Sequence, residues 1–144
     1  MLLLRDRGSD QRTPIPASGR MVQTARIVVP AMGASGSRVV EFSGTVTGLQ
    51  RGETLWIILK RPAGQLYYPA AGPCSVDGDQ WTCGKVDLDK PGGYMAFPLL
   101  ANEEGTLRMA ALVPARATWS ALDPVDRLPG GTWQWGPEVL FAAR

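Results

Sequence analysis

Arg38–Arg61, RVVEFSGTVTGLQRGETLWIILKR, is the stretch that decides the fold, because it predicts two antiparallel strands joined by a turn. In its first half, small or apolar residues alternate with polar ones. One side of an extended chain would carry Val40, Phe42, Gly44 and Val46. The other side would carry Glu41, Ser43, Thr45 and Thr47. This period of two is typical of a strand with one buried and one solvated face.

The second half of the stretch follows a turn bracketed by Gly48 and Gly52 and contains the unbroken apolar run Leu55–Leu59, LWIIL. Such a run favours a central strand that is covered on both faces. A buried helix is the alternative, but the space between the glycine turn and Arg61-Pro62 is too short for one.

Outward from this pair, the chain shows frequent turn signals, with 17 glycines and 12 prolines among 144 residues. Further strands are expected at residues 25–30, 65–68, 94–100, 106–113 and 132–142, the last interrupted at Gly136-Pro137. The segment 114–122, PARATWSAL, predicts a helix, because Pro114 can open it and Ala115, Trp119 and Leu122 recur at helical spacing. The sum is an all-β antiparallel sandwich of seven or eight short strands with one short helix before the last strand.

The N-terminal residues 1–22 show no periodicity and include Thr13-Pro14-Ile15-Pro16. They are expected to form a tail or linker, compatible with a tether to a missing domain, and residues 23–144 to form the sandwich. With 144 residues there is room for one domain with one sizeable core.

Two cysteines stand in the segment Cys74–Cys83, CSVDGDQWTC. If residues 77–80 form the loop of a hairpin, Val76 faces Trp81 and Cys74 faces Cys83 across two strands. The pair is then either a disulfide, which the register favours, or two buried thiols. A disulfide favours an extracytoplasmic or cell-surface location, and free thiols favour the cytoplasm.

Several chemistries are excluded or disfavoured by composition. The chain has no histidine, which removes Ser-His-Asp and Cys-His catalysis and histidine zinc sites. A net charge of +2, spread without a basic stripe, gives no reason to expect nucleic-acid binding. No segment approaches the roughly 20 apolar residues that cross a bilayer, so membrane insertion by this chain is not expected. No cofactor is expected.

Two kinds of residue remain as candidates for a site. Turn aspartates could gather oxygen ligands for calcium or act as catalytic carboxylates: Asp77, Asp79, Asp87 and Asp89. Aromatic side chains could form a platform for a sugar or a protein: Trp133, Trp135, Tyr67, Tyr68 and Trp81. Trp133 and Trp135 share one face of the last strand, which is either exposed or part of the sandwich core.

Two resemblances add to this reading. The V-x-F-x-G-x-V strand, the turn and the L-W-I-I-L strand resemble strands B and C of immunoglobulin-like domains, with Trp56 as the core tryptophan. Cys74 and Cys83 are too close in sequence to replace the inter-sheet cysteine pair of those domains. A longer pattern, G-T-V-x-G-L-x-x-G-x-x-L-W, then Y-Y-P, then P-C-S-V-D-G-D-x-W-T-C, is similar to uncharacterised sandwich modules at the C-terminal end of multidomain bacterial proteins.

The resemblance implies an immunoglobulin-like fold and an accessory role with no catalytic residues. The sequence is therefore interpreted as a non-catalytic interaction or sensor module of a larger bacterial protein that binds a protein or envelope ligand. One alternative is a carbohydrate-binding module that uses exposed tryptophan and tyrosine side chains. Another is a small calcium-dependent or carboxylate-based enzyme.

Overall fold

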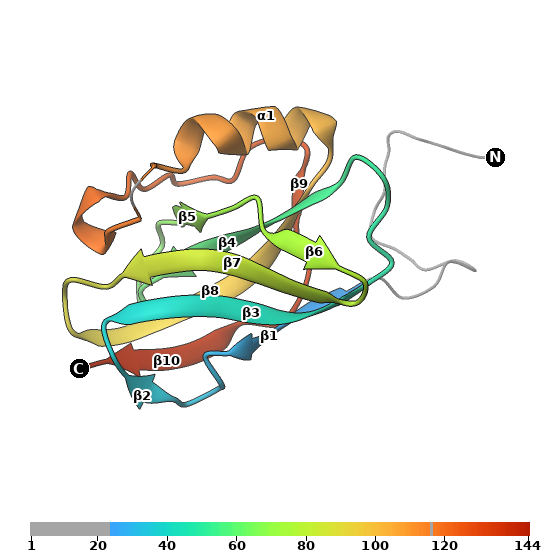
Figure 1. Ribbon diagram of the computed structural model, residues 1–144. Helices are drawn as coiled ribbons and strands as arrows, with labels where there is room; N and C mark the ends of the chain where they lie inside the picture. The colour runs from blue at the N-terminus through green and yellow to red at the C-terminus, as the bar shows by residue number, and fades with distance from the viewer. Residues whose placement is uncertain (1–23, 116) are drawn as a thin grey trace.

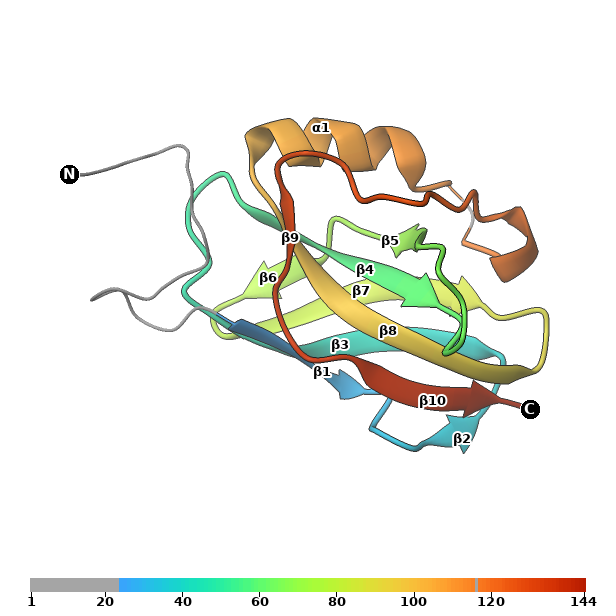
Figure 2. The same ribbon diagram turned by 180° about the vertical axis from the view of Figure 1, so that it is seen from behind.

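Two β-sheets packed face to face and one α-helix form the part of the chain that the computed structural model describes, residues 24–115 and 117–144 (Figures 1 and 2). The tail or linker expected at residues 1–22 lies outside the described residues. The protein is mostly β, with antiparallel sheets and one helix, as expected. The order of the strands within each sheet determines which faces remain open.

The first sheet, sheet A, has the strand order β1-β3-β7-β6. Its strands are β1 (Thr24–Val29), β3 (Val39–Thr47), β6 (Ser75–Asp77) and β7 (Gln80–Asp87). The second sheet, sheet B, has the order β2-β10-β8-β4-β5, and β9 pairs with β8 next to β10. Its strands are β2 (Ser35–Gly36), β4 (Thr54–Lys60), β5 (Tyr68–Ala71), β8 (Gly92–Ala101), β9 (Thr132–Gln134) and β10 (Val139–Ala143). All of these pairs are antiparallel except β2 with β10.

Ten strands in the described residues exceed the expected seven or eight. The last strand is interrupted near Gly136-Pro137 as predicted, and its two parts, β9 and β10, both pair with β8. The short strand expected at residues 65–68 is wrong in position, because β5 covers Tyr68–Ala71 and includes Pro69. A proline is tolerated there because β5 is the edge strand of sheet B.

The run Leu55–Leu59 is buried on both sides, which confirms its predicted place as a central strand. Leu55, Ile57 and Leu59 belong to the core between the two sheets. Trp56 and Ile58 point to the opposite face and pack with Met109 of the helix in a second core. The prediction that Trp56 is a core residue is confirmed, since it is 1% exposed, and its core is the one under the helix. Successive side chains of a strand point to opposite faces, and Trp56 takes the face under the helix.

The helix α1 (Glu103–Leu112) overturns two expectations. Residues 102–105 were expected to form a turn and residues 106–113 a strand, whereas the helix was expected at residues 114–122. Among the described residues of that segment, 114–115 and 117–122, the helical part is the short 3₁₀ helix η1 (Trp119–Ala121). Pro114 disfavours helical geometry at the residue before it, Val113, which is extended and caps the end of α1. Pro114 therefore helps to end one helix and does not begin another.

Asn102 explains why α1 begins where it does. Its side chain accepts a hydrogen bond from the backbone N–H of Gly105 at 2.9 Å, as a helix N-cap does. Glu103 and Glu104 then place negative charge in the first turn, which stabilises the helix dipole. In the sequence Gly105 indicates a turn, whereas in the structure a glycine is needed there because the backbone of Gly131 lies close to it. A Cβ atom there would lie 2.2 Å from the carbonyl oxygen of Gly131.

Replacing Asn102 by alanine removes the cap and should lower the free energy of unfolding by about 1 kcal/mol. Urea denaturation followed by tryptophan fluorescence measures this change. Asn102→Asp is the matched control, because an aspartate accepts the same hydrogen bond and should restore most of the stability. Equal losses in the two variants would show that Asn102 contributes through another contact.

Candidate functional site

Among the described residues, no helix covers the outer face of sheet A. On sheet B, α1 covers the outer face over β4 and β8 through the core that contains Trp56 and Met109, whereas Leu140 on β10 is 42% exposed. Figures 1 and 2 show α1 on the side of β4 and β5, away from β3 and β1. On sheet A the alternation predicted for β3 is confirmed: Phe42 and Val46 are buried, whereas Glu41 and Thr45 are exposed.

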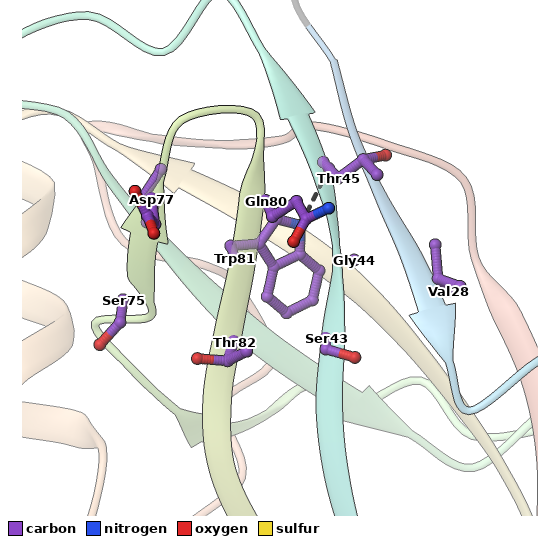
Figure 3. A pocket seen from close by; sticks show the side chains of 10 residues that line it. Val28, Ser43, Gly44, Thr45, Ser75, Asp77, Gln80, Trp81 and Thr82 are labelled. Atoms are coloured by element: carbon purple, nitrogen blue, oxygen red, sulfur yellow. Dashed lines mark hydrogen bonds between the residues drawn. The ribbon is translucent and has the colours of Figure 1, made fainter.

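A shallow depression of about 530 Å³ lies on this face (Figure 3). Its lining is dominated by short hydrogen-bonding side chains and comes from all four strands of sheet A. The lining residues are Val28, Ser43, Gly44, Thr45, Ser75, Val76, Asp77, Gln80, Trp81 and Thr82. The hydroxyl, amide and carboxylate groups offer hydrogen bonds, while Val28, Val76 and the Trp81 ring add apolar surface, so the hollow suits a ligand surface of mixed character.

The register of the sheet arranges the polar lining residues, together with neighbours on β1, in two rows across the strands. One row runs Val29, Ser43, Thr82, Ser75, and the next runs Arg26, Thr45, Gln80, Asp77. Figure 3 shows members of both rows side by side on β3, β7 and β6. Neighbouring strands are about 4.8 Å apart, so each row presents polar groups at a regular spacing.

The Gly44–Trp81 pair supports the floor of the depression. The two residues are direct partners across β3 and β7, and Trp81 is 2% exposed. Its indole Nε1 donates a hydrogen bond to the carbonyl oxygen of Thr45 at 2.9 Å. Gly44 leaves the space that the ring and strand β1 need, because a Cβ atom there would lie 1.7 Å from the Arg26 carbonyl oxygen. Side-chain growth at Gly44 would therefore push β1 away from β3.

The hairpin β6–β7 forms one side of the site, and its predicted register is confirmed. Val76 pairs with Trp81, Ser75 pairs with Thr82, and a disulfide joins Cys74 to Cys83 with Cα atoms 4.4 Å apart. The loop is tighter than the expected four residues, because Asp77 and Gln80 also pair. Gly78 has a φ of 65°, which suits the first loop position of a two-residue hairpin turn.

The predicted aromatic residues are not gathered on one exposed surface. Trp81, one of the candidates for a surface platform, is buried, because its side chain alternates inward between Gln80 and Thr82. Trp133 and Trp135 are partly buried against the inter-sheet core, the alternative that the sequence left open. Tyr68 packs on that core, whereas Tyr67 packs on the core under α1.

A second aromatic group, Tyr68, Tyr94 and Trp119, fills one end of the sandwich. The Tyr68 and Trp119 ring centroids are 4.2 Å apart, and Tyr94 meets Trp119 edge to face at 5.0 Å. The Arg61 guanidinium lies over the Tyr94 ring at 4.1 Å. Burial raises the pKa of the Tyr94 phenol, although Arg61 acts in the opposite direction. These contacts are internal, so the group holds η1 against the sheets and offers no cage to a ligand.

The aspartates considered for calcium do not converge. Within residues 24–115 and 117–144, no three histidine, cysteine, aspartate or glutamate side chains are close enough to hold a metal ion. Hydrogen bonding with Ser120, first through its side chain and then through its backbone N–H, lowers the pKa of the Asp89 carboxyl group. Asp77 lies in a different place, in the lining of the depression on sheet A.

The residues that line the depression on β6 and β7 were missed by the sequence analysis as a group. The exposed side of β3, with Ser43 and Thr45, was visible in the alternation. Ser75, Gln80 and Thr82 flank the cysteine hairpin, but their place beside β3 requires the pairing of β3 with β7, which are far apart in sequence. Only that pairing turns separate polar residues into one surface.

Comparison with known proteins adds no assignment to this geometry. No protein-family model matches the chain, and no curated protein is found to be similar to it. Among the described residues, no helix has the length and apolar character needed to cross a membrane. We therefore infer function from the residues of the site and from the fold that presents them.

Proposed function

We propose that this chain is a non-catalytic, immunoglobulin-like interaction module of a larger bacterial protein, and that it binds a protein of the cell envelope. The observation that carries the proposal is the outer face of sheet A, which no helix within residues 24–115 and 117–144 covers and which presents two rows of hydrogen-bonding side chains. A non-obligate interface between proteins is about as polar as the rest of the surface and contains about ten direct hydrogen bonds, which the hydroxyl and amide groups of this face could supply.

The strand order supports the immunoglobulin-like part of the proposal. Immunoglobulin domains have strands A-B-E-D in one sheet and C-F-G in the other. If β1, β3, β4, β6, β7 and β8 are strands A to F in chain order, sheet A has the order A-B-E-D and sheet B contains C-F. Together β9 and β10 then take the place of strand G, and α1 belongs to the connection between F and G.

Tyr94 supports the same assignment. It lies near the start of β8, the counterpart of strand F, and its hydroxyl group donates a hydrogen bond to the carbonyl oxygen of Lys90, four residues earlier. A tyrosine with this backbone contact at the corner between strands E and F is a hallmark of immunoglobulin-like sandwiches. Ala96 stands two residues later, where such domains carry the second inter-sheet cysteine, so the Cys74–Cys83 bridge is a different device.

A protein ligand is favoured over a glycan because of where the aromatic residues lie. Sugar rings are commonly held on exposed aromatic faces, whereas Trp81 is buried and Trp133 and Trp135 pack against the core. The disulfide favours a compartment outside the reducing cytosol, and envelope proteins are the partners available there.

The test uses the immobilised chain to retain proteins from a detergent extract of bacterial envelopes. Thr45→Arg/Thr82→Arg fills the open face with bulk and charge and should abolish retention of the proteins that bind the unaltered chain. Leu107→Arg is the matched control, because Leu107 is 76% exposed on α1 and should be neutral. Equal retention by all three proteins, with thermal denaturation showing them folded, would refute the proposed site.

A further inference from the structure

Four exposed charged side chains occupy mirrored positions on the outer face of sheet A. Arg26 lies on the edge strand β1, and Asp77 lies on the opposite edge strand β6 in the same row. Glu41 lies on the central strand β3, and Lys85 is its direct partner on β7. An imaginary line between β3 and β7 divides the face in two halves. Each acidic residue on one side of this line has a basic residue at the same distance on the other side.

This pattern is complementary to itself under one symmetry operation. A two-fold rotation about an axis parallel to the strands, in the plane of the contact, reverses the order of the strands but keeps each row in place. Arg26 of one copy then faces Asp77 of the second copy. Glu41 of one copy faces Lys85 of the second copy by the same rotation. A two-fold contact uses the same patch on both partners, so both pairs of charges occur twice.

We infer that the partner of this face is a second copy of the chain, bound face to face through sheet A. The inference rests on the proposed function in taking this face as the interaction surface, and it names the occupant. The other charged residue of the face, Asp87, is the register partner of Val39, so the rotation brings no like charge against it. The two rows of hydroxyl and amide groups then face each other across the contact.

The size of the face sets the expected strength. Four strands at about 4.8 Å, the longest with 9 residues at about 3.4 Å, fit within roughly 19 by 30 Å, so the face is smaller than about 600 Å². A standard interface buries about 800 Å² per partner, so the dimer belongs with weak and transient complexes. The two facing depressions leave room for bridging water between the hydroxyl groups, as is common in polar interfaces. Added salt should weaken the association, because exposed charge pairs are screened.

Sedimentation velocity of the full chain at increasing concentration tests the inference. The unaltered chain should show a reversible monomer–dimer equilibrium. Asp77→Arg places Arg26 against an arginine twice in the dimer, and it should weaken the association by about tenfold or more. Arg26→Asp should have the same effect through two aspartate pairs. Leu107→Arg on α1 is the control and should associate like the unaltered chain.

Mixing the two variants gives the decisive result. A copy with Asp77→Arg has two basic edges and a copy with Arg26→Asp has two acidic edges, so the mixture should dimerise although neither variant does alone. A mixture that stays monomeric, or variants that dimerise like the unaltered chain, would overturn the inference. Should either variant unfold, Glu41→Lys and Lys85→Glu provide the same comparison from the central strands.

The two proposals fail in different ways. An unaltered chain that stays monomeric at every concentration, while Thr45→Arg/Thr82→Arg abolishes retention of an envelope protein, overturns the second copy as partner and leaves the interaction surface in place. A dimer that is unaffected by charge reversal on sheet A overturns the inference as well, because it must use another surface. If Thr45→Arg/Thr82→Arg still dimerises and still retains the envelope proteins, both the interaction surface and the second copy as its partner are contradicted.

Discussion

Trp81→Ala is expected to lower the free energy of unfolding by about 3–5 kcal/mol, the usual effect of truncating a buried tryptophan. Trp81 is 2% exposed, faces Gly44 across the sheet and donates a hydrogen bond to the carbonyl oxygen of Thr45. Truncation would leave a cavity under the depression and free that carbonyl from its partner. Urea denaturation monitored by circular dichroism measures the loss without depending on the removed fluorophore.

Two variants serve as controls for this prediction. Trp81→Phe keeps most of the ring volume but loses the indole N–H, so it should recover much of the stability. Trp133→Ala removes a half-buried ring and should cost less than Trp81→Ala. A Trp81→Ala protein as stable as the unaltered chain would mean that the ring lies at the surface, where it could belong to an aromatic platform, and not in the core.

Removal of the Cys74–Cys83 disulfide is expected to have the second-largest effect. The bridge spans nine positions, and closing a loop of about ten residues stabilises a fold by roughly 2–3 kcal/mol in the chain-entropy model. Cys74→Ala/Cys83→Ala should lose about that much. Alanine is chosen because both positions are buried and a serine would place a hydroxyl group in the core.

Reductant provides the matched control for the disulfide. The unaltered chain in reductant should unfold at the same urea concentration as the double alanine variant, and reductant should leave the variant unchanged. Mass spectrometry after alkylation of the unreduced, denatured protein should detect no alkyl adducts. Two adducts would show that the cysteines are free thiols, and the argument for an envelope partner would lose its support.

The helix α1 illustrates why local sequence signals were ambiguous. Residues 102–105 carry asparagine, two glutamates and glycine, which suit both a turn and the first turn of a capped helix. The choice depends on Gly131, whose carbonyl oxygen accepts from the N–H of Asn102 and leaves no space for a Cβ atom at residue 105. That contact joins residues far apart in the sequence, so no local pattern indicates it.

By itself the sequence determined the β3 and β4 strands and the register of the cysteine hairpin, which places Cys74 opposite Cys83. These features follow from period-two alternation and from a tight turn, both of which act over neighbouring residues. Only the tertiary structure decided which sheet face stays open, because α1 covers sheet B through contacts with Trp56 and Ile58. It also decided that Arg26, Thr45, Gln80 and Asp77 share one row, since strand pairing brings together residues that are far apart along the chain.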